Sequence, residues 1–416
     1  MEILTVTEHD TLPIDNSQKI GQKAISRKYS DALSRLEKLL PKKAWTWGHK
    51  HIKFGNYCGV ISLGNLTIEI LPKIYGKETN KESSRDVLVK MLYRARRLKL
   101  QRTGSTGINL QRHNLLDVFI LHFCDQLYAE MTQGMIRSYI ERNENLNVLR
   151  GRLCIEQHLK HNLAHRERLF CQYDELSVDN VHNRILKFVL NILLKKASGN
   201  RTHQQVSELL MRFEAISDIT IVDSDMLNTL NFDRSTSRYG PIFEQCKWFL
   251  ANQYPDVMKG KETCVSLLFD MNQLFEAYIG FEFRKKAWSE GLKVREQGPQ
   301  KYFVKRMDTG QNVFRMKPDF TFLRDKSQIV AIADAKWKLL DEKEKKLGLS
   351  QPDLYQIQSY ATRYDVKKVF LVYPMQREMK SCVELSLKGS NTSLIVVPID
   401  VCSKSCKILQ DLSIKG

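Results

Sequence analysis

Two aspartates and a lysine toward the C-terminal end of the chain have the types and the spacing of a site for phosphodiester hydrolysis. Pro318-Asp319 is followed, after fourteen residues, by Asp334-Ala335-Lys336. Hydrolysis needs a divalent ion that offsets the phosphate charge and lowers the pKa of the attacking water, and two carboxylates can hold that ion. Because side chains alternate along a strand, Lys336 projects to the same face as Asp334 and can contact the phosphate or orient the water. The backbone carbonyl of Ala335 can serve as a further metal ligand.

This spacing has rivals in the same part of the chain. Asp334 ends the apolar run 329–333, so a buried strand would hold its carboxylate rigidly, whereas Asp365 lies in a polar segment. We therefore expect Asp319 and Asp334 to form the metal site. The rival motifs are Pro352-Asp353 with Asp365-Val366-Lys367, and Asp341-Glu342-Lys343 in a charged loop.

Three further side chains are expected beside the two aspartates. Gln356 and Tyr360 are four residues apart in a predicted helix over 353–363, so they share one face and can reach the carboxylates or a DNA phosphate. Glu276 lies in a predicted helix over 267–286 and could complete the acidic cluster. The alternative is that Gln356 and Tyr360 only contribute to packing and that Glu276 faces solvent.

The elements that must position these residues divide the chain into three expected parts. Residues 1–110 are predicted to be β-rich, because two apolar runs flank Gly64-Asn65, a pair suited to a tight hairpin turn. Residues 111–260 contain segments with apolar residues three or four apart and are predicted to be mainly helical. Residues 261–416 are predicted to contain an α-β-β-α-β unit, with a mixed sheet flanked by helices. The expected fold class is therefore a multi-domain α+β or α/β protein.

The composition excludes several classes of protein. The 416 residues include 65 Lys and Arg against 47 Asp and Glu, and the resulting formal charge of +18 favours a polyanionic partner. Hydrophobic residues make up 42% of the chain, which excludes extensive disorder. No apolar run approaches the ~18 residues that cross a bilayer, and the N-terminal segment lacks the pattern of a signal peptide. The nine cysteines contain no CxxC pair, so we expect a cytoplasmic protein with reduced thiols.

Other groups of residues have both a functional and a structural interpretation. Three histidines spaced three and four apart would align on a helix, but their segment is basic and polar, so a solvated face is favoured over a metal site. Arg150-Gly151-Arg152 could contact DNA phosphate or a partner, or could be a turn with exposed charge. Two tryptophans near cations could stack on bases, although core packing is favoured. These residues are His158, His161, His165, Trp45 and Trp47.

The motifs as a set resemble those of the PD-(D/E)XK nuclease superfamily, and Gln356 with Tyr360 is similar to the additional motif of its RecB-like branch. The chain more closely resembles the McrC family, the nuclease subunits of McrBC modification-dependent restriction systems. This similarity covers most of the chain. It is carried by Ile68–Lys73, Gly151–Leu153, Asp179–Ile185, Asn272–Tyr278, Pro318-Asp319, Asp334–Trp337 and Leu354–Gln356.

The resemblance implies a Mg²⁺-dependent DNA endonuclease, with Mn²⁺ as an alternative ion, that acts in phage defence. It also implies a partner, an McrB-like AAA+ GTPase ring that recognises methylated double-stranded DNA. The N-terminal region 1–110 of this chain is then expected to dock in that ring and to stimulate its GTP hydrolysis. The chain itself has no GxxxxGK[ST] loop for nucleotide phosphates. The alternative function is a non-catalytic adaptor that binds DNA and activates the GTPase, with its carboxylates retained only for structure.

Overall fold

A computed structural model describes residues 2–15, 24–38, 40, 44–74, 80–95, 114–164, 167–234, 236–251, 253–255, 263–324, 328–338, 340, 344, 346–375, 379–389, 391–402 and 414. The chain divides into two compact units, of which the smaller is 101–253 and the larger combines 2–100 with 254–416. The three-part division expected from the sequence differs from this grouping, because strand β11 (Thr263–Asp270) pairs with strand β5 (Tyr57–Leu63). The expected boundaries near residues 110 and 260 lie outside the described residues.

The larger unit contains a five-stranded sheet in the order β1-β6-β5-β11-β10. Strands β5 and β6 form the hairpin predicted around Gly64-Asn65, and Gly64 has the positive φ of 54° that this tight turn favours. Nearly every residue of both strands is buried, so the hairpin forms part of the core. The remaining strands are β1 (Glu2–Thr7), β6 (Leu66–Leu71) and β10 (Gln253–Pro255).

A smaller three-stranded sheet, in the order β2-β4-β3, and helix α1 share a hydrophobic core with this sheet. Trp45 is buried in that core, as expected, whereas the indole N–H of Trp47 donates to Glu37 at 2.7 Å. The interpretation as a core-packing residue is therefore confirmed for Trp45 and is wrong for Trp47, which is exposed. The elements are β2 (Thr11–Pro13), α1 (Arg27–Leu36), β3 (Trp45–Gly48), β4 (His51–Phe54) and, after β6, helix α2 (Lys81–Ala95).

Helix α9 (Met271–Ser289) follows β11 directly and leads into a six-stranded sheet in the order β12-β15-β16-β17-β19-β18. Strands β15 and β16 are antiparallel, whereas β16, β17 and β19 run parallel. Helix α10 (Gln351–Tyr364) connects β16 to β17, since parallel neighbours need a crossover. The strands are β12 (Lys293–Glu296), β15 (Phe320–Arg324), β16 (Gln328–Ala335), β17 (Lys368–Pro374), β18 (Val383–Ser386) and β19 (Ser393–Ile399).

Two predicted elements near the candidate site are wrong in detail. The strand predicted over 313–322 is two strands, β14 (Asn312–Met316) and β15, which are separated at Pro318, a residue without an N–H for a strand ladder. The helix predicted from Leu267 begins only at Met271, because the preceding residues pair with β5. Asp270 then caps the helix by accepting hydrogen bonds from the backbone of its first turn.

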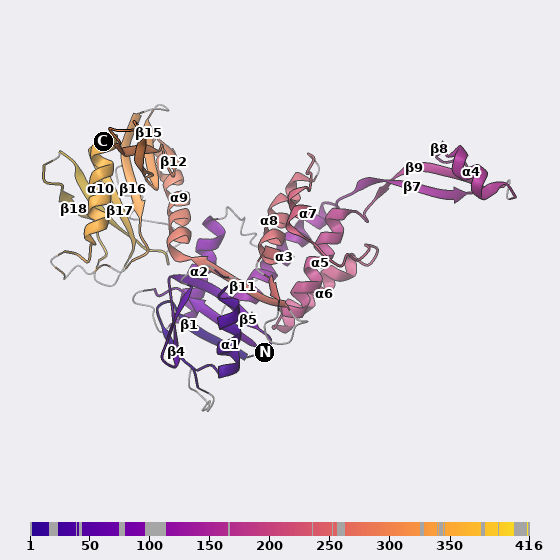
Figure 1. The fold of residues 1–416 in the computed structure, drawn as a ribbon, viewed down its shortest axis with the longest axis horizontal. Coiled ribbons are helices and arrows are strands. Elements are labelled where there is room, and N and C mark those ends of the chain that lie inside the picture. Colours follow the sequence, from indigo (N-terminus) through magenta and orange to yellow (C-terminus); the bar gives the residue numbers. More distant parts are fainter. Residues whose placement is uncertain are drawn as a thin grey trace. The chain divides into compact units, whose positions relative to one another are not determined.

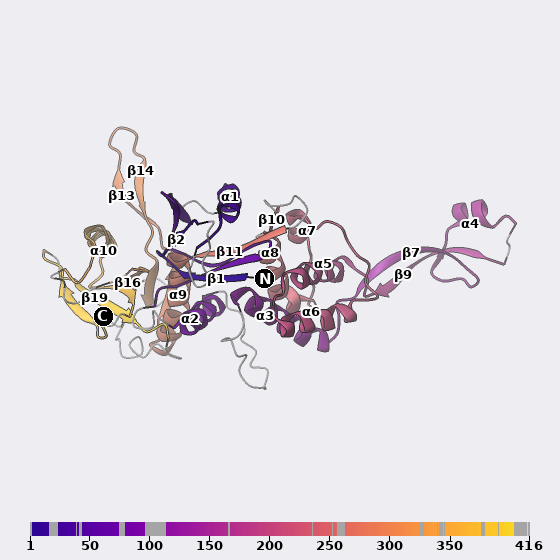
Figure 2. The ribbon, with the colours of Figure 1, turned by 90° about the horizontal axis from the view of Figure 1, so that it is seen from below.

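Strands β13 (Lys301–Lys305) and β14 form a separate two-stranded hairpin between β12 and β15 in the sequence. Figure 2 shows this hairpin extending away from the six-stranded sheet. The chain returns from the hairpin at Met316, only three residues before Asp319. The hairpin is therefore continuous in sequence with the candidate site.

The smaller unit is a group of helices that carries a long two-stranded arm (Figure 1). Strands β7 and β9 pair antiparallel from Ser138–Ser177 to Leu146–Leu169. The helices predicted around 115–131, 179–197 and 242–251 are confirmed as α3, α5 and α8. The elements are α3 (Leu115–Thr132), β7 (Ser138–Leu146), β8 (Arg152–Leu153), α4 (Ile155–Asn162), β9 (Leu169–Ser177), α5 (Val181–Lys196), α6 (Asn200–Arg212), α7 (Ser224–Asn228) and α8 (Gly240–Ala251).

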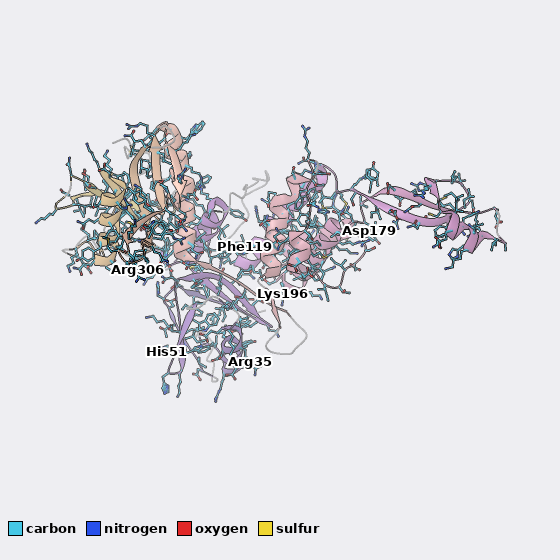
Figure 3. The ribbon with its side chains drawn as sticks, turned by 45° about the horizontal axis from the view of Figure 1, so that its top comes forward. Arg35, His51, Phe119, Asp179, Lys196 and Arg306 are labelled. Atoms are coloured by element: carbon cyan, nitrogen blue, oxygen red, sulfur yellow. The ribbon has the colours of Figure 1, made fainter. Side chains whose placement is uncertain are left out.

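Polar side chains fix the base of the arm to the start of helix α5, and Figure 3 labels one of them, Asp179. Asp179 forms a bidentate ion pair with Arg184 and accepts hydrogen bonds from the backbone and the hydroxyl of Ser217. Asn183 donates to two backbone carbonyls at the base of the arm, those of Ile136 before β7 and Val178 after β9. The polar motif in 179–185 thus has a structural role in this chain. No helix in the described ranges is both long and apolar enough to cross a membrane.

Candidate functional site

Asp319 and Asp334 lie together at one end of the antiparallel β15–β16 pair. Asp319 immediately precedes β15, and Asp334 is the penultimate residue of β16. The ladder pairs Phe320 with Ala333, which places the two aspartates next to each other where the pairing ends. The backbone N–H of Ala335 donates a 3.0 Å hydrogen bond to the Asp319 carboxylate, so the strand backbone orients this side chain. The Asp334 residue is only 2% exposed.

Lys336, Gln356 and Tyr360 form a continuous chain of polar contacts that starts at Asp334. The Lys336 ammonium lies 2.7 Å from the Asp334 carboxylate and donates to the Gln356 side chain at 3.2 Å. The Gln356 amide donates to the Tyr360 hydroxyl at 3.1 Å, and this hydroxyl donates to the Lys317 carbonyl at 3.2 Å. Helix α10 therefore orients the ammonium and also anchors the segment that precedes the first aspartate.

Glu276 approaches the two aspartates from helix α9. Its carboxylate accepts a hydrogen bond from the Gln297 side chain, and the Gln297 backbone N–H donates to the Asp319 carbonyl at 2.8 Å. The charge of Glu276 contributes to the raised pKa of Asp319, so the two carboxyls are within electrostatic range. The structure therefore places Glu276 at the cluster rather than on a solvated face. Gln297 was not predicted, because nothing in its local sequence distinguishes it.

Burial and mutual repulsion raise the pKa values of the acidic groups. Burial raises the pKa of Asp319 to about 8, and the charges of Asp334 and Glu276 add to this shift. Burial also raises the pKa of Asp334, although Lys336 opposes the rise. For Lys336, burial favours the neutral amine, but Asp334 outweighs it and the pKa is raised. The acidic cluster thus carries electrostatic strain that a bound cation would relieve.

The donor atoms of this site suit a hard divalent cation such as Mg²⁺. Asp319 and Asp334 supply carboxylate oxygens. The N–H and C=O of one strand residue point to the same edge, so the carbonyl of Ala335 faces the edge where its N–H meets Asp319. Within the part of the chain that the structure describes, no three His, Cys, Asp or Glu side chains are arranged to hold a metal. A cation here would therefore use two carboxylates, one carbonyl, and water or substrate.

The rival motifs are not brought together in the same way. Asp353 and Asp365 lie near opposite ends of helix α10, so the helical rise separates them by about 18 Å. Asp353 instead forms a 2.8 Å ion pair with Lys338. The motif at 341–343 lies outside the described residues.

The histidines of helix α4 have ordinary packing partners. His158 is hydrogen-bonded to the Asn162 side chain at 3.0 Å, and His161 stacks on Phe170 with the ring centroids 5.6 Å apart. His165 lies outside the described residues. These contacts agree with the structural interpretation of this segment.

Arg150 and Arg152 lie in the arm beside the middle of strand β9, next to Tyr173 and Gln172. Gly151 between them has a φ of 68°, and a Cβ there would come within 2.4 Å of the Gln172 carbonyl, so the turn requires glycine. The Arg150 guanidinium lies 4.0 Å from the ring centroid of Tyr173, and both arginines are exposed. Both arginines belong to the smaller unit and the aspartates to the larger one.

Glu8 is linked to the candidate site although the sequence did not single it out. Its carboxylate accepts hydrogen bonds from the Trp337 indole and the Lys73 backbone, both at 2.9 Å. It therefore ties the residue that follows Lys336 to the end of strand β1. No local pattern could reveal this contact, because the partners are 329 positions apart. A pocket of about 320 Å³ at this contact is lined by Glu8, His9, Asn56, Lys73, Trp337, Lys338 and Pro374.

The burial of Glu8 predicts a pH dependence of stability. Burial raises the pKa of Glu8 from 4.5 to about 7, so between these values the native state keeps a proton that the unfolded state has lost. The bound proton stabilises the native state fully below pH 4.5. As the pH rises to 7 this contribution is lost, which lowers the free energy of unfolding by roughly 3 kcal/mol. Chemical denaturation at several pH values should show that the free energy of unfolding falls more steeply with rising pH in the wild type than in Glu8→Gln. Parallel pH profiles of the two proteins would disprove it.

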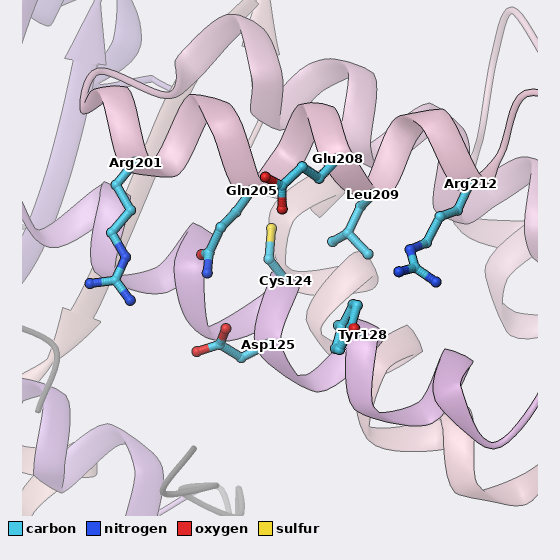
Figure 4. A pocket seen from close by; sticks show the side chains of 8 residues that line it. All are labelled: Cys124, Asp125, Tyr128, Arg201, Gln205, Glu208, Leu209 and Arg212. Carbon is cyan, nitrogen blue, oxygen red and sulfur yellow. The ribbon is translucent and has the colours of Figure 1, made fainter. Parts of the chain in front are cut away.

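A second pocket, of about 340 Å³, lies between helices α3 and α6 of the smaller unit (Figure 4). The Arg212 guanidinium lies 4.9 Å from the ring centroid of Tyr128, and burial raises the pKa of Asp125 against the opposing charge of Arg201. Opposite charges thus balance within this pocket. The lining residues, none of which belongs to a motif of the sequence, are Cys124, Asp125, Tyr128, Arg201, Gln205, Glu208, Leu209 and Arg212.

Comparisons with known proteins agree with this architecture. A chain from the solved half-complex of a tetradecameric assembly of Thermococcus gammatolerans McrB AAA+ hexamers with bound McrC has a TM-score of 0.75, 19% identity and 98% coverage of both chains. A chain from the cryo-EM structure of the Thermococcus gammatolerans McrBC complex has a TM-score of 0.53 and 22% identity, over 68% of this chain and 88% of that one. No curated protein matches. The family model for the McrBC 5-methylcytosine restriction system component matches residues 52–374, and the chain therefore belongs to this family.

Proposed function

We propose that this chain is the nuclease subunit of a modification-dependent restriction system and that its six-stranded sheet with α9 and α10 is a PD-(D/E)XK nuclease domain. The observation that carries the proposal is a pair of aspartates at the adjoining ends of two strands, Asp334 buried and Asp319 partly buried, with Lys336 held against Asp334. Two repelling carboxyls side by side destabilise a fold unless positive charge offsets them, and the single ammonium of Lys336 balances only one of the two negative charges.

Each side chain then has a definite task in the hydrolysis of a DNA phosphodiester. Asp319, Asp334 and the Ala335 carbonyl would hold Mg²⁺, which neutralises phosphate charge and acidifies water when bound. Lys336 donates from its ammonium to the phosphate and stabilises its growing negative charge. Gln356 and Tyr360 keep that ammonium oriented.

Glu276, with its raised pKa, accepts the proton that the attacking water releases. The water oxygen bonds to phosphorus and the bond to the 3′ oxygen breaks, which leaves a 5′-phosphate and a 3′-hydroxyl. In this proposal the two aspartates, Glu276, Lys336, Gln356 and Tyr360 all act in a single hydrolytic step.

We further propose that the chain works in the cytoplasm with an AAA+ GTPase ring that recognises methylated DNA. The similar Thermococcus gammatolerans chains come from complexes of McrB with McrC. The arm of the smaller unit, rather than the N-terminal region 1–110, is the surface we propose for stimulating this ring, because it exposes apolar side chains that a partner would cover. They are Val148, Leu149, Ile155, Leu159 and Leu163.

The metal site predicts a specific loss of affinity. Asp319→Asn should weaken Mn²⁺ binding at least tenfold in calorimetry without DNA, because it removes one of two carboxylate ligands. Asp365→Asn is the matched control, since this aspartate is exposed at the end of helix α10 and asparagine tolerates its φ of 54°. The Mn²⁺ affinity of the wild type should also fall as the pH drops below 8, because a proton then competes with the metal ion for the Asp319 carboxylate.

Two outcomes would oppose this proposal. Equal Mn²⁺ affinity in the wild type and Asp319→Asn would remove Asp319 from the metal site. Stimulation of the ring's GTPase with tight DNA binding but no metal-dependent cleavage would favour the non-catalytic adaptor.

A further inference from the structure

We propose that the β13–β14 hairpin is a DNA-binding wedge, which places Phe303 and Phe314 against the bases of duplex DNA beside the cleaved phosphate while its basic side chains contact the backbone. This inference rests on the proposed nuclease function for its choice of ligand. Its test is independent of cleavage.

The hairpin is an isolated ribbon (Figure 2), and it carries large apolar side chains that are exposed. Phe303 is 57% exposed, Phe314 is 73% exposed and Met307, at the turn, is 97% exposed. Among the described strands, β13 and β14 pair only with each other. A two-stranded ribbon cannot bury such side chains by itself, so their exposure calls for an external partner.

Phe314 also has a backbone conformation that bulky residues rarely adopt. Its φ is 58°, in the left-handed region, where glycine or asparagine would be less strained. Its side chain is largely exposed, so packing within the chain does not explain why an aromatic residue occupies this position. Strain of this kind persists where a residue has a functional role.

The charge of the hairpin identifies a polyanion as the partner. Residues 301–316 contain four basic side chains and one acidic side chain, Asp308. The Asp308 carboxylate is already paired with Arg306, which Figure 3 labels. Proteins that wedge into DNA combine cations on the phosphates with apolar side chains between bases. The basic residues are Lys301, Lys305, Arg306 and Arg315.

The base of the hairpin is fixed to the helix that carries Gln356 and Tyr360. The Arg363 guanidinium donates to the Tyr302 carbonyl at 2.9 Å, and the Tyr364 hydroxyl donates to the Pro299 carbonyl at 2.6 Å. The hairpin is thereby held in a set position relative to the aspartates. Its five-residue strands span roughly 17 Å, about half a turn of DNA, so its tip can reach bases within several base pairs of the cleaved bond.

Phe314→Gly separates a role in DNA binding from a role in folding. This substitution removes the aromatic ring and relieves the backbone strain, so the melting temperature should stay the same or rise. Affinity of the full chain for a labelled 30-base-pair duplex, measured in chelator by fluorescence anisotropy, should fall about tenfold. Trp288→Ser, at an 86% exposed aromatic near the end of α9, is the matched control and should leave the affinity unchanged. Lys305→Ala should reduce the slope of log affinity against log salt concentration by about one, the contribution of a single phosphate contact.

Two results would overturn the inference. One is equal DNA affinity in the wild type and Phe314→Gly. The other is self-association of the chain, measured by sedimentation, that Phe314→Gly abolishes while DNA affinity is unchanged, because the hairpin would then bind a second copy. A third outcome is that Phe314→Gly weakens DNA binding although the wild type, together with its partner GTPase ring, never cleaves DNA. In that case the wedge is supported and the nuclease proposal fails.

Discussion

Lys336→Met should lower the rate of DNA cleavage about 10³-fold while divalent-metal binding is retained or strengthened. The ammonium of Lys336 is the cation that the structure holds against Asp334, at 2.7 Å, and Gln356 orients it. Methionine keeps the length of the side chain but cannot stabilise negative charge on the phosphate. Metal affinity should not fall, because the ammonium and the metal compete for the same carboxylate. Single-turnover cleavage and calorimetry on the same preparations measure the two effects.

The control for this prediction is Lys367→Met, in the rival motif. Lys367 is exposed in the loop after helix α10, and this variant should cleave DNA at the wild-type rate. A large loss in Lys367→Met together with full activity in Lys336→Met would transfer the site to the rival motif.

Arg85→Met should lower the free energy of unfolding by about 3–5 kcal/mol. Arg85, on helix α2, forms a bidentate ion pair with Glu69 on strand β6, with both contacts at 2.7 Å. The Glu69 side chain is fully buried, so removal of the arginine leaves a carboxylate without its countercharge in the core. Chemical denaturation of the two proteins, followed by circular dichroism, measures this loss.

The double variant Glu69→Met/Arg85→Met tests the explanation. Replacing both members of a buried pair with apolar residues removes the unpaired charge, so most of the stability should return. If the double variant is as unstable as Arg85→Met, the loss arises from packing rather than from the isolated carboxylate.

The part of the site that the sequence predicts consists of residues with local signals. Asp334 follows a run of apolar residues, so its place at the end of a buried strand follows from hydrophobic patterning. Gln356 and Tyr360 share a face because they are four residues apart on a helix. The hairpin around Gly64-Asn65 was predictable for the same reason, since its turn chemistry is local.

What the sequence could not show depends on contacts between distant residues or on exposed elements. The hydrogen bond between Glu8 and Trp337 joins opposite ends of the chain, and β11 pairs with β5 across some two hundred residues. The β13–β14 hairpin has no buried face, so it lacks the alternation that marks a strand. The strand predicted through Pro318 was wrong because apolar residues on both sides favoured one continuous strand, although proline cannot donate a hydrogen bond within a strand ladder.

The most direct test is cleavage of methylated and unmethylated plasmid by this chain co-expressed with its ring GTPase, in Mg²⁺ and GTP, for the wild type and Asp334→Ala. We expect the wild type to cut and the variant to lose cutting by at least 10³-fold while it still stimulates GTP hydrolysis, because Asp334 belongs to the nuclease site and not to the arm. Equal cutting by both proteins would contradict the assignment of Asp334 and with it the proposed nuclease site.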